Sequence, residues 1–93
     1  MPNQKDYEKA QKYSELRKEG KLEEAKKYRD LHGADLTGAN LTRADLRDAD
    51  LHGANFSRCD LRNSDLRGCN LSGSNLNGVC ISLSNVYQRI ETV

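Results

Sequence analysis

The sequence predicts a solenoid whose chain turns a corner every five residues and closes a square every twenty. From Ala34 onward the chain divides into eleven consecutive five-residue units, and the third place of every unit is apolar. The segment DLHGA occurs from Asp30 and again from Asp50. Glycines repeat the same spacing of twenty at Gly33, Gly53 and Gly73.

Neither regular element accommodates a period of five. On a helix, five residues advance the side-chain direction by about 140°, so the apolar centres would scatter around the axis. On one strand, odd spacing would alternate them between the two faces. A corner after each unit instead points one large and one small residue inward on every side. Glycine suits such corners because it adopts unusual backbone dihedrals without a steric cost.

The three leading places of the unit have distinct roles. The first place is small in nearly every unit, and the second is Asp or Asn everywhere except Cys80. The Asp and Asn side chains are expected to bond neighbouring backbone at the corners. The apolar centres are the predicted structural core: Leu36, Leu41, Leu46, Leu51, Phe56, Leu61, Leu66, Leu71, Leu76, Ile81 and Val86.

Residues 1–33 lack the five-residue phase and predict a helical hairpin that caps the coil. Asn3 with Asp6 is typical of a helix N-cap, and Gly20 suits a helix stop. Apolar residues at helical spacing mark a first helix (Tyr7, Ala10, Tyr13, Leu16) and a shorter second one (Leu22, Ala25, Tyr28). The hairpin also resembles a single tetratricopeptide-type unit, which would bind a peptide, but a lid over the first coil is the preferred interpretation.

The A(D/N)LXX pattern resembles the pentapeptide-repeat family over residues 34–88. The resemblance implies a mainly β fold, a right-handed quadrilateral β-helix with four units per coil and about three coils here. The expected organisation is a helical cap (residues 1–33), the β-helix (residues 34–88) and a C-terminal tail (residues 89–93).

The C-terminal end is unusually apolar. Related proteins of the family often dimerise through their C-terminal coils, so we expect a homodimer, with a tail folded over the last coil as the alternative. The candidate self-association residues are Val79, Leu83, Val86, Ile90 and Val93.

Composition limits the possible partners. The net charge is +1, from 15 basic and 14 acidic residues, which gives no strong field for nucleic acid. No apolar run approaches the length of a membrane span. The three cysteines have no metal-type spacing and suggest a reduced, cytoplasmic protein, in which exposed Cys80 is the reactive thiol.

Two pairs of polar residues are candidate sites of chemistry. His32 and His52, each two residues after an Asp, are expected side by side and could grip a transition metal, but a pair of exposed Asp–His neighbours is the preferred interpretation. Arg47 and Arg67 are expected to form surface ion pairs with nearby carboxylates. No catalytic, cofactor or metal residue is therefore predicted.

The predicted function is a small structural or protein-interaction module whose partner the sequence does not identify. No enzyme activity is expected, because a leucine-filled interior leaves no room for a substrate. The alternative is a DNA mimic that inhibits or protects a topoisomerase, as gyrase-protection proteins of the family that the chain resembles are thought to do. Residues 34–93 hold six Arg against six Asp and one Glu, which is too balanced for a convincing mimic.

Overall fold

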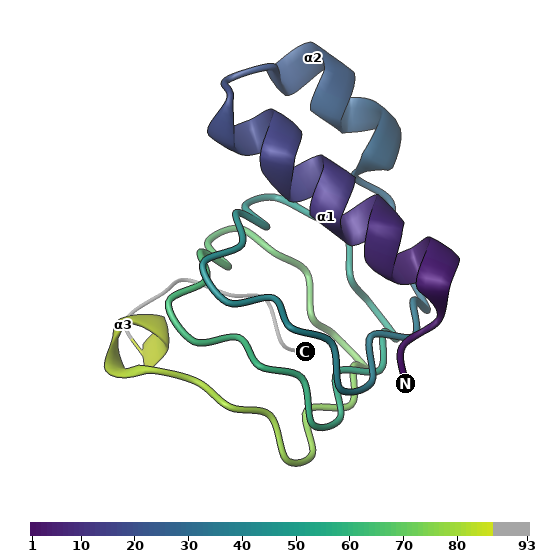
Figure 1. Cartoon of the computed structure of the whole chain (residues 1–93), viewed down its shortest axis with the longest axis vertical. Coiled ribbons are helices and arrows are strands. Elements are labelled where there is room, and N and C mark those ends of the chain that lie inside the picture. Colours follow the sequence, from purple (N-terminus) through teal and green to yellow (C-terminus); the bar gives the residue numbers. More distant parts are fainter. Residues whose placement is uncertain (87–93) are drawn as a thin grey trace.

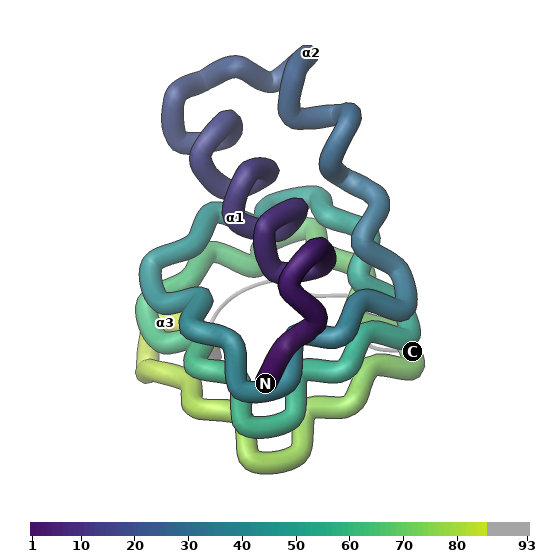
Figure 2. The backbone as a smooth tube through the Cα atoms, turned by 45° about the vertical axis from the view of Figure 1, so that its right-hand side comes forward, coloured from purple at the N-terminus to yellow at the C-terminus, as the bar shows by residue number. Residues whose placement is uncertain are grey.

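The computed structural model describes residues 1–86, and within them the chain winds into stacked four-sided coils below a pair of helices (Figures 1 and 2). Parallel bridges join second-place residues twenty apart, as in Asp30 to Asp50 and Asp50 to Asn70. Each side contributes a single bridging residue, because a corner follows at once. No continuous strand therefore forms in the described part, and the mainly β expectation is met by isolated bridges alone.

The corners carry the backbone geometry that the glycine spacing predicted. In the first, the N–H of Ala34 donates to the carbonyl of Leu31 at 3.1 Å, and Gly33 has φ of +67°. Positive φ at the third residue of a four-residue turn is the signature of a type II turn. Four non-glycine residues adopt the same geometry at equivalent corners: Arg43, Asp48, Arg58 and Asn63.

The interior of the coil is filled by the apolar centres and the small first-place residues. The centres from Leu31 to Leu71 are buried, as are Cys59 and Cys69 between them. Two predicted core residues are exceptions: Leu76 is 38% exposed and Ile81 is 52% exposed. Both lie in the third coil, where no further coil covers them among the described residues, so their assignment to a closed core was wrong. Val86 belongs to the same list, but its side chain lies outside the described part.

Helix α1 (Gln4–Lys18) lies across the first coil and packs on it (Figure 2). Its N-cap forms as predicted, with the N–H of Asp6 donating to Oδ1 of Asn3 at 3.1 Å. The chain turns at Gly20 into α2 (Leu22–Ala25) and the 3-10 helix η1 (Lys26–Tyr28). The apolar face of α1 joins the core of the coil through Ala10, Tyr13 and Leu16.

The coil ends earlier than residue 88, where the sequence placed its boundary. The last bridge joins Asp60 to Cys80, and α3 (Leu83–Val86) takes the place of the next corner. A further corner would force Leu83 into positive φ, which a branched side chain resists. Asn85 and Ser82 instead bond each other at the start of α3. The predicted tail, residues 89–93, lies outside the described residues.

None of the helices in residues 1–86 is both long and apolar enough to cross a membrane.

Candidate functional site

The second-place Asp and Asn side chains hold the corners, as the sequence predicted. In each of ten units the side-chain oxygen accepts the backbone N–H two residues later, as from Thr37 to Asp35 at 3.1 Å and from Ser57 to Asn55 at 2.9 Å. This is the Asx-turn bond, and it uses an acceptor that a binding site would otherwise employ. The repeated polar column is therefore structural.

Two sides of the coil carry paired rather than free charges. Arg47 binds Asp45 through Nε and an outer nitrogen at 2.9 and 2.7 Å, and Arg67 binds Asp65 in the same way. The bonds from Arg67 hold the pKa of Asp65 below its usual value. Arg62 and Asp60 repeat the arrangement on a neighbouring side. These contacts pair each of the three arginines with a carboxylate of its own repeat unit.

His32 and His52 stack in adjacent coils with ring centroids 5.0 Å apart and ring planes 7° from parallel. Nδ1 of His32 lies 2.5 Å from Oδ1 of Asp30, and Nδ1 of His52 lies 2.6 Å from Oδ1 of Asp50. The bond to Asp30 raises the pKa of His32. Within residues 1–86, no group of three or more His, Cys, Asp or Glu side chains is arranged to hold a metal. The Asp–His neighbours are present in adjacent coils, each bonded within its own repeat unit.

The cysteines divide as predicted between interior and surface. Cys59 and Cys69 are buried and free, and burial raises the pKa of each to about 12, so both remain thiols at neutral pH. Cys80 is exposed. It replaces the Asp or Asn of the second place, and α3 follows it instead of a regular corner.

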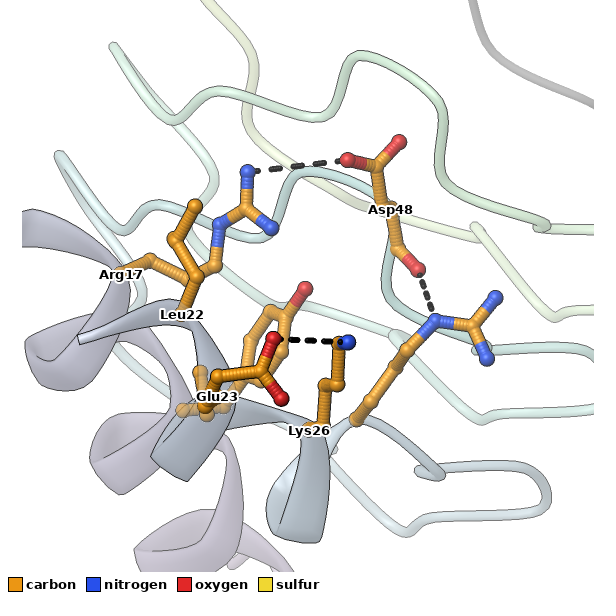
Figure 3. A pocket seen from close by; sticks show the side chains of 8 residues that line it. Arg17, Leu22, Glu23, Lys26 and Asp48 are labelled. Atoms are coloured by element: carbon orange, nitrogen blue, oxygen red, sulfur yellow. Dashed lines mark hydrogen bonds and ion pairs between the residues drawn. The ribbon is translucent and has the colours of Figure 1, made fainter. Parts of the chain in front are cut away.

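A hollow of about 310 Å³ lies between α2 and the coil (Figure 3). Tyr13 lies within it, while Arg17 faces Asp48 across it at 3.6 Å and Lys26 contacts Glu23 at 3.0 Å. Its cations and carboxylates are therefore largely paired with one another. The hollow joins the helices to the coil. Nε of Arg17 is buried there without a hydrogen-bond partner among the described residues, and lies 3.9 Å from Oδ1 of Asp45.

The C-terminal end of the coil contains a hollow of a different kind. It measures about 170 Å³, and its lining is apolar apart from one amide: Leu61, Leu66, Leu71, Leu76, Val79, Ile81 and Asn85. Beside it Leu83 is 72% exposed. A contiguous apolar surface of this kind marks an interaction site more often than chance exposure of single residues does.

The predicted self-association residues only partly describe this end. Val79 packs against the core and Leu83 projects from α3, while Ile90, Val93 and the side chain of Val86 lie outside the described part. Leu76 and Ile81 were missed because the regular pattern assigned them to the interior. Their exposure could have been predicted from their place in the last coil, because the last coil of a solenoid has no neighbour beyond it.

The model of pentapeptide repeats, in eight copies, matches residues 30–63 and 49–86. These ranges cover more than half of the chain and coincide with the coil. This chain belongs to the pentapeptide-repeat family. A search of curated proteins finds no match to it.

Two solved structures resemble this pentapeptide-repeat protein. One is the pentapeptide repeat protein Rfr23 from the cyanobacterium Cyanothece 51142, with 36% identity and a TM-score of 0.55 over 69% of this chain. This chain spans 40% of the length of that protein. The other is alr5209, a pentapeptide repeat protein from Nostoc PCC 7120, with 22% identity and a TM-score of 0.31 over 68% of this chain and 85% of that one.

Proposed function

We propose that this pentapeptide-repeat protein is a protein-interaction module that docks through the C-terminal end of its coil, with a second copy of the chain as the partner. The observation that carries the proposal is the apolar hollow bordered by Leu76 and Ile81. Burying exposed apolar area contributes about 25 cal/mol per Å², so this end gains most from a partner.

The opposite end supports the same choice. There α1 covers the first coil, and the side chains of Leu36 and Leu46 are fully buried. An interface through that end would require α1 to leave. Within residues 1–86, docking through the C-terminal ends requires no element to leave, and a twofold arrangement would close after two copies.

The finer architecture belongs to this proposal. We infer a right-handed β-helix, the hand that the family resemblance implies, with α1, α2 and η1 as its helical cap. The proposal assigns no catalytic role, because the hydroxyls, thiols and imidazoles of the coil form no nucleophile–base pair in the contacts described above. A cytoplasmic location remains part of the proposal, resting on the free thiols.

Imitation of DNA draws no support from the side chains. A mimic needs rows of unpaired acids, yet Asp45, Asp60 and Asp65 are each forked to an arginine. We therefore do not carry topoisomerase protection forward as a second function.

Light scattering on the wild type and on a variant with Ile81→Arg and Leu83→Arg tests the proposal. The wild type should have the mass of two copies, and the variant the mass of one, because two buried arginines without partners oppose docking. Gln4→Arg with Gln11→Arg adds the same charge to exposed positions of α1 and should leave the dimer intact.

Two results would contradict self-docking at this end. One is a wild type with the mass of a single copy at every concentration tested. The other is a dimer that survives both C-terminal arginines, since its interface would then lie elsewhere.

A further inference from the structure

The two ends of the coil differ in their hydrogen-bonding polarity. On each side, the N–H groups of the third and fifth places donate to the next coil, as Leu51 does to Asn70 and Gly53 to Ser72, both at 2.9 Å. One bond runs the other way, from the N–H of Asn70 to the carbonyl of Ala49 at 3.1 Å. The edge of the first coil is therefore rich in acceptors, and the edge of the last coil is rich in donors.

Helix α1 supplies the acceptors that a preceding coil would offer to the first coil. The N–H of Asp35 donates to Oδ2 of Asp6 at 2.8 Å, and the N–H of Asp45 donates to Oγ of Ser14 at 2.8 Å. Equivalent N–H groups one coil later, such as that of Asn55, donate to a backbone carbonyl of the preceding coil. Side-chain oxygens of α1 thus occupy the positions of backbone carbonyls.

The same segment also supplies the donors. The hydroxyl of Tyr7 donates to the carbonyl of Asn40 at 2.9 Å, and the hydroxyl of Tyr13 donates to the carbonyl of Arg47. Two further carbonyls of the first coil, those of Asp30 and Asp35, are also occupied. Their donors are Nζ of Lys9 at 2.5 Å and the backbone N–H of Asn3 at 3.0 Å. At these six positions the N-terminal segment therefore supplies the hydrogen-bond partners that a preceding coil would supply, with the correct polarity.

The other edge has no such cover in the described part of the chain. There the N–H groups of Leu71, Gly73, Leu76 and Gly78 have no hydrogen-bond partner among residues 1–86. The carbonyls of Cys69, Ser74 and Val79, which point the same way in the repeat, also lack one there. This edge surrounds the apolar hollow, so it combines unused donors with unburied apolar surface.

We propose that α1 is a plug. It covers the edge of the first coil and so prevents the last coil of a second copy from docking there. When α1 is displaced, two copies stack head to tail and continue one ladder. The acceptor-rich edge then meets the donor-rich edge with the same twenty-residue square and the same spacing of about 4.8 Å between coils. Two C-terminal edges set face to face would instead bring together two donor-rich edges, so fewer of their N–H groups would find acceptors and a tail-to-tail dimer relies more on apolar contact.

Replacing α1 by the last coil of a second copy both uncovers and buries apolar side chains. Displacing α1 uncovers the leucines of the first coil together with its own Tyr13 and Leu16, which are buried on that coil. Docking a last coil covers the same leucines with Leu76, Val79 and Ile81, which are exposed or only partly buried beforehand. Unprotected sheet edges pair with one another in this way, and natural proteins cover them to prevent it. With α1 in place, assembly stops at the tail-to-tail dimer, whereas displacement of α1 allows head-to-tail stacking without a fixed end.

The test uses the full chain with Asp6→Ala, Tyr13→Phe and Ser14→Ala, which remove three ladder contacts and keep the aromatic ring. Amide exchange followed by NMR should become about tenfold faster at Asp35 and Asp45, because their acceptors are gone. Sedimentation velocity should show species larger than two copies, growing with concentration. Gln11→Ala with Lys12→Ala and Glu15→Ala changes exposed positions of α1 and should do neither.

Adding Leu76→Arg to the triple variant (Asp6→Ala, Tyr13→Phe, Ser14→Ala) should abolish the larger species, because it places a charge on the edge of the last coil that docks. Faster exchange without larger species would overturn the proposal, and so would unchanged exchange, because the contacts would then not hold α1. If the triple variant fails to fold, Tyr13→Phe alone should still shift the distribution towards larger species, and no shift would again overturn it. The comparison is always with the wild type, so it stands whether or not the wild type forms the proposed dimer.

Discussion

Arg43, Asp48, Arg58 and Asn63 show how strongly the repeat dictates local geometry. Each holds a φ close to +60° at the fifth place, where five other units have glycine. Left-handed geometry costs a non-glycine residue roughly 1–2 kcal/mol. The chain tolerates it because the turn bond, the ladder and the Asx bond all require the same conformation at these corners.

Gly53→Ala should therefore destabilise the fold by about 1–2 kcal/mol, through backbone strain alone. A Cβ at this position would have its nearest neighbour, the backbone nitrogen of Gly33, at 4.0 Å, so no clash contributes. The reverse change, Asn63→Gly, removes strain but loosens the unfolded chain, and should range from neutral to about 1 kcal/mol stabilising. Urea unfolding measures both, and equal losses in the two variants would refute the strain account.

His32 should titrate above its ordinary pKa of 6.5, because Asp30 accepts a bond from its ring and favours the charged form. The same bond lowers the pKa of Asp30. The raised imidazole pKa stabilises the fold fully below pH 6.5, and this contribution is lost as pH rises through the folded-state pKa. The lowered carboxyl pKa stabilises it above pH 3.8, and that contribution is lost as pH falls through the folded-state pKa.

NMR titration of the His32 ring checks this prediction. Asp30→Asn keeps the shape of the side chain but removes its charge, and should move the pKa of His32 down towards 6.5. Asp35→Asn makes the same change at a carboxylate whose side-chain partner is Thr37, and is the matched control. A His32 pKa that ignores both substitutions would show that the bond to Asp30 does not form in solution.

At the scale of elements, the sequence predicted what repeats and missed what interrupts the repeat. Strict phase at the third place, with Asp or Asn before it, was enough for the corners, the interior columns and the four-sided coil. The polar contacts of α1 with the coil carried no such periodic signal. Asp6 and Ser14 are ordinary helix-surface residues in the sequence, and only the helix orientation brings them to the ladder edge.

The start of α3, at the other end of the coil, is a second feature that the repeat pattern did not predict. Leu83 stood out as an apolar residue at a fifth place, which indicated an irregular end but not a helix. The structure resolves the conflict locally, since Ser82 and Asn85 bond to each other and also replace backbone partners of the coil above. Side chains that imitate backbone thus occur at both ends of the coil, and periodicity alone identifies neither.

The whole molecule is a short coil whose first end is covered by α1 and whose last end is not covered within residues 1–86. The same substitution is therefore expected to change stability by different amounts at the two ends. Leu36 and Leu76 occupy one interior column, twenty residues either side of Phe56. Leu36 is fully buried beneath α1, whereas Leu76 is 38% exposed. In a solenoid, stability is roughly a sum over neighbouring repeats, so a residue with a neighbour on one side only contributes less.

Leu36→Ala should destabilise the single chain by about 2–5 kcal/mol, and Leu76→Ala by less than about 1.5 kcal/mol. Urea unfolding at concentrations below any self-association measures both costs in the same column. At higher concentration the loss in Leu76→Ala should grow while that in Leu36→Ala stays constant, because only Leu76 lies where a second copy would dock. Equal costs in the dilute protein would mean that both ends are covered in solution, and neither docking through the last coil nor a plug specific to the first would then be tenable.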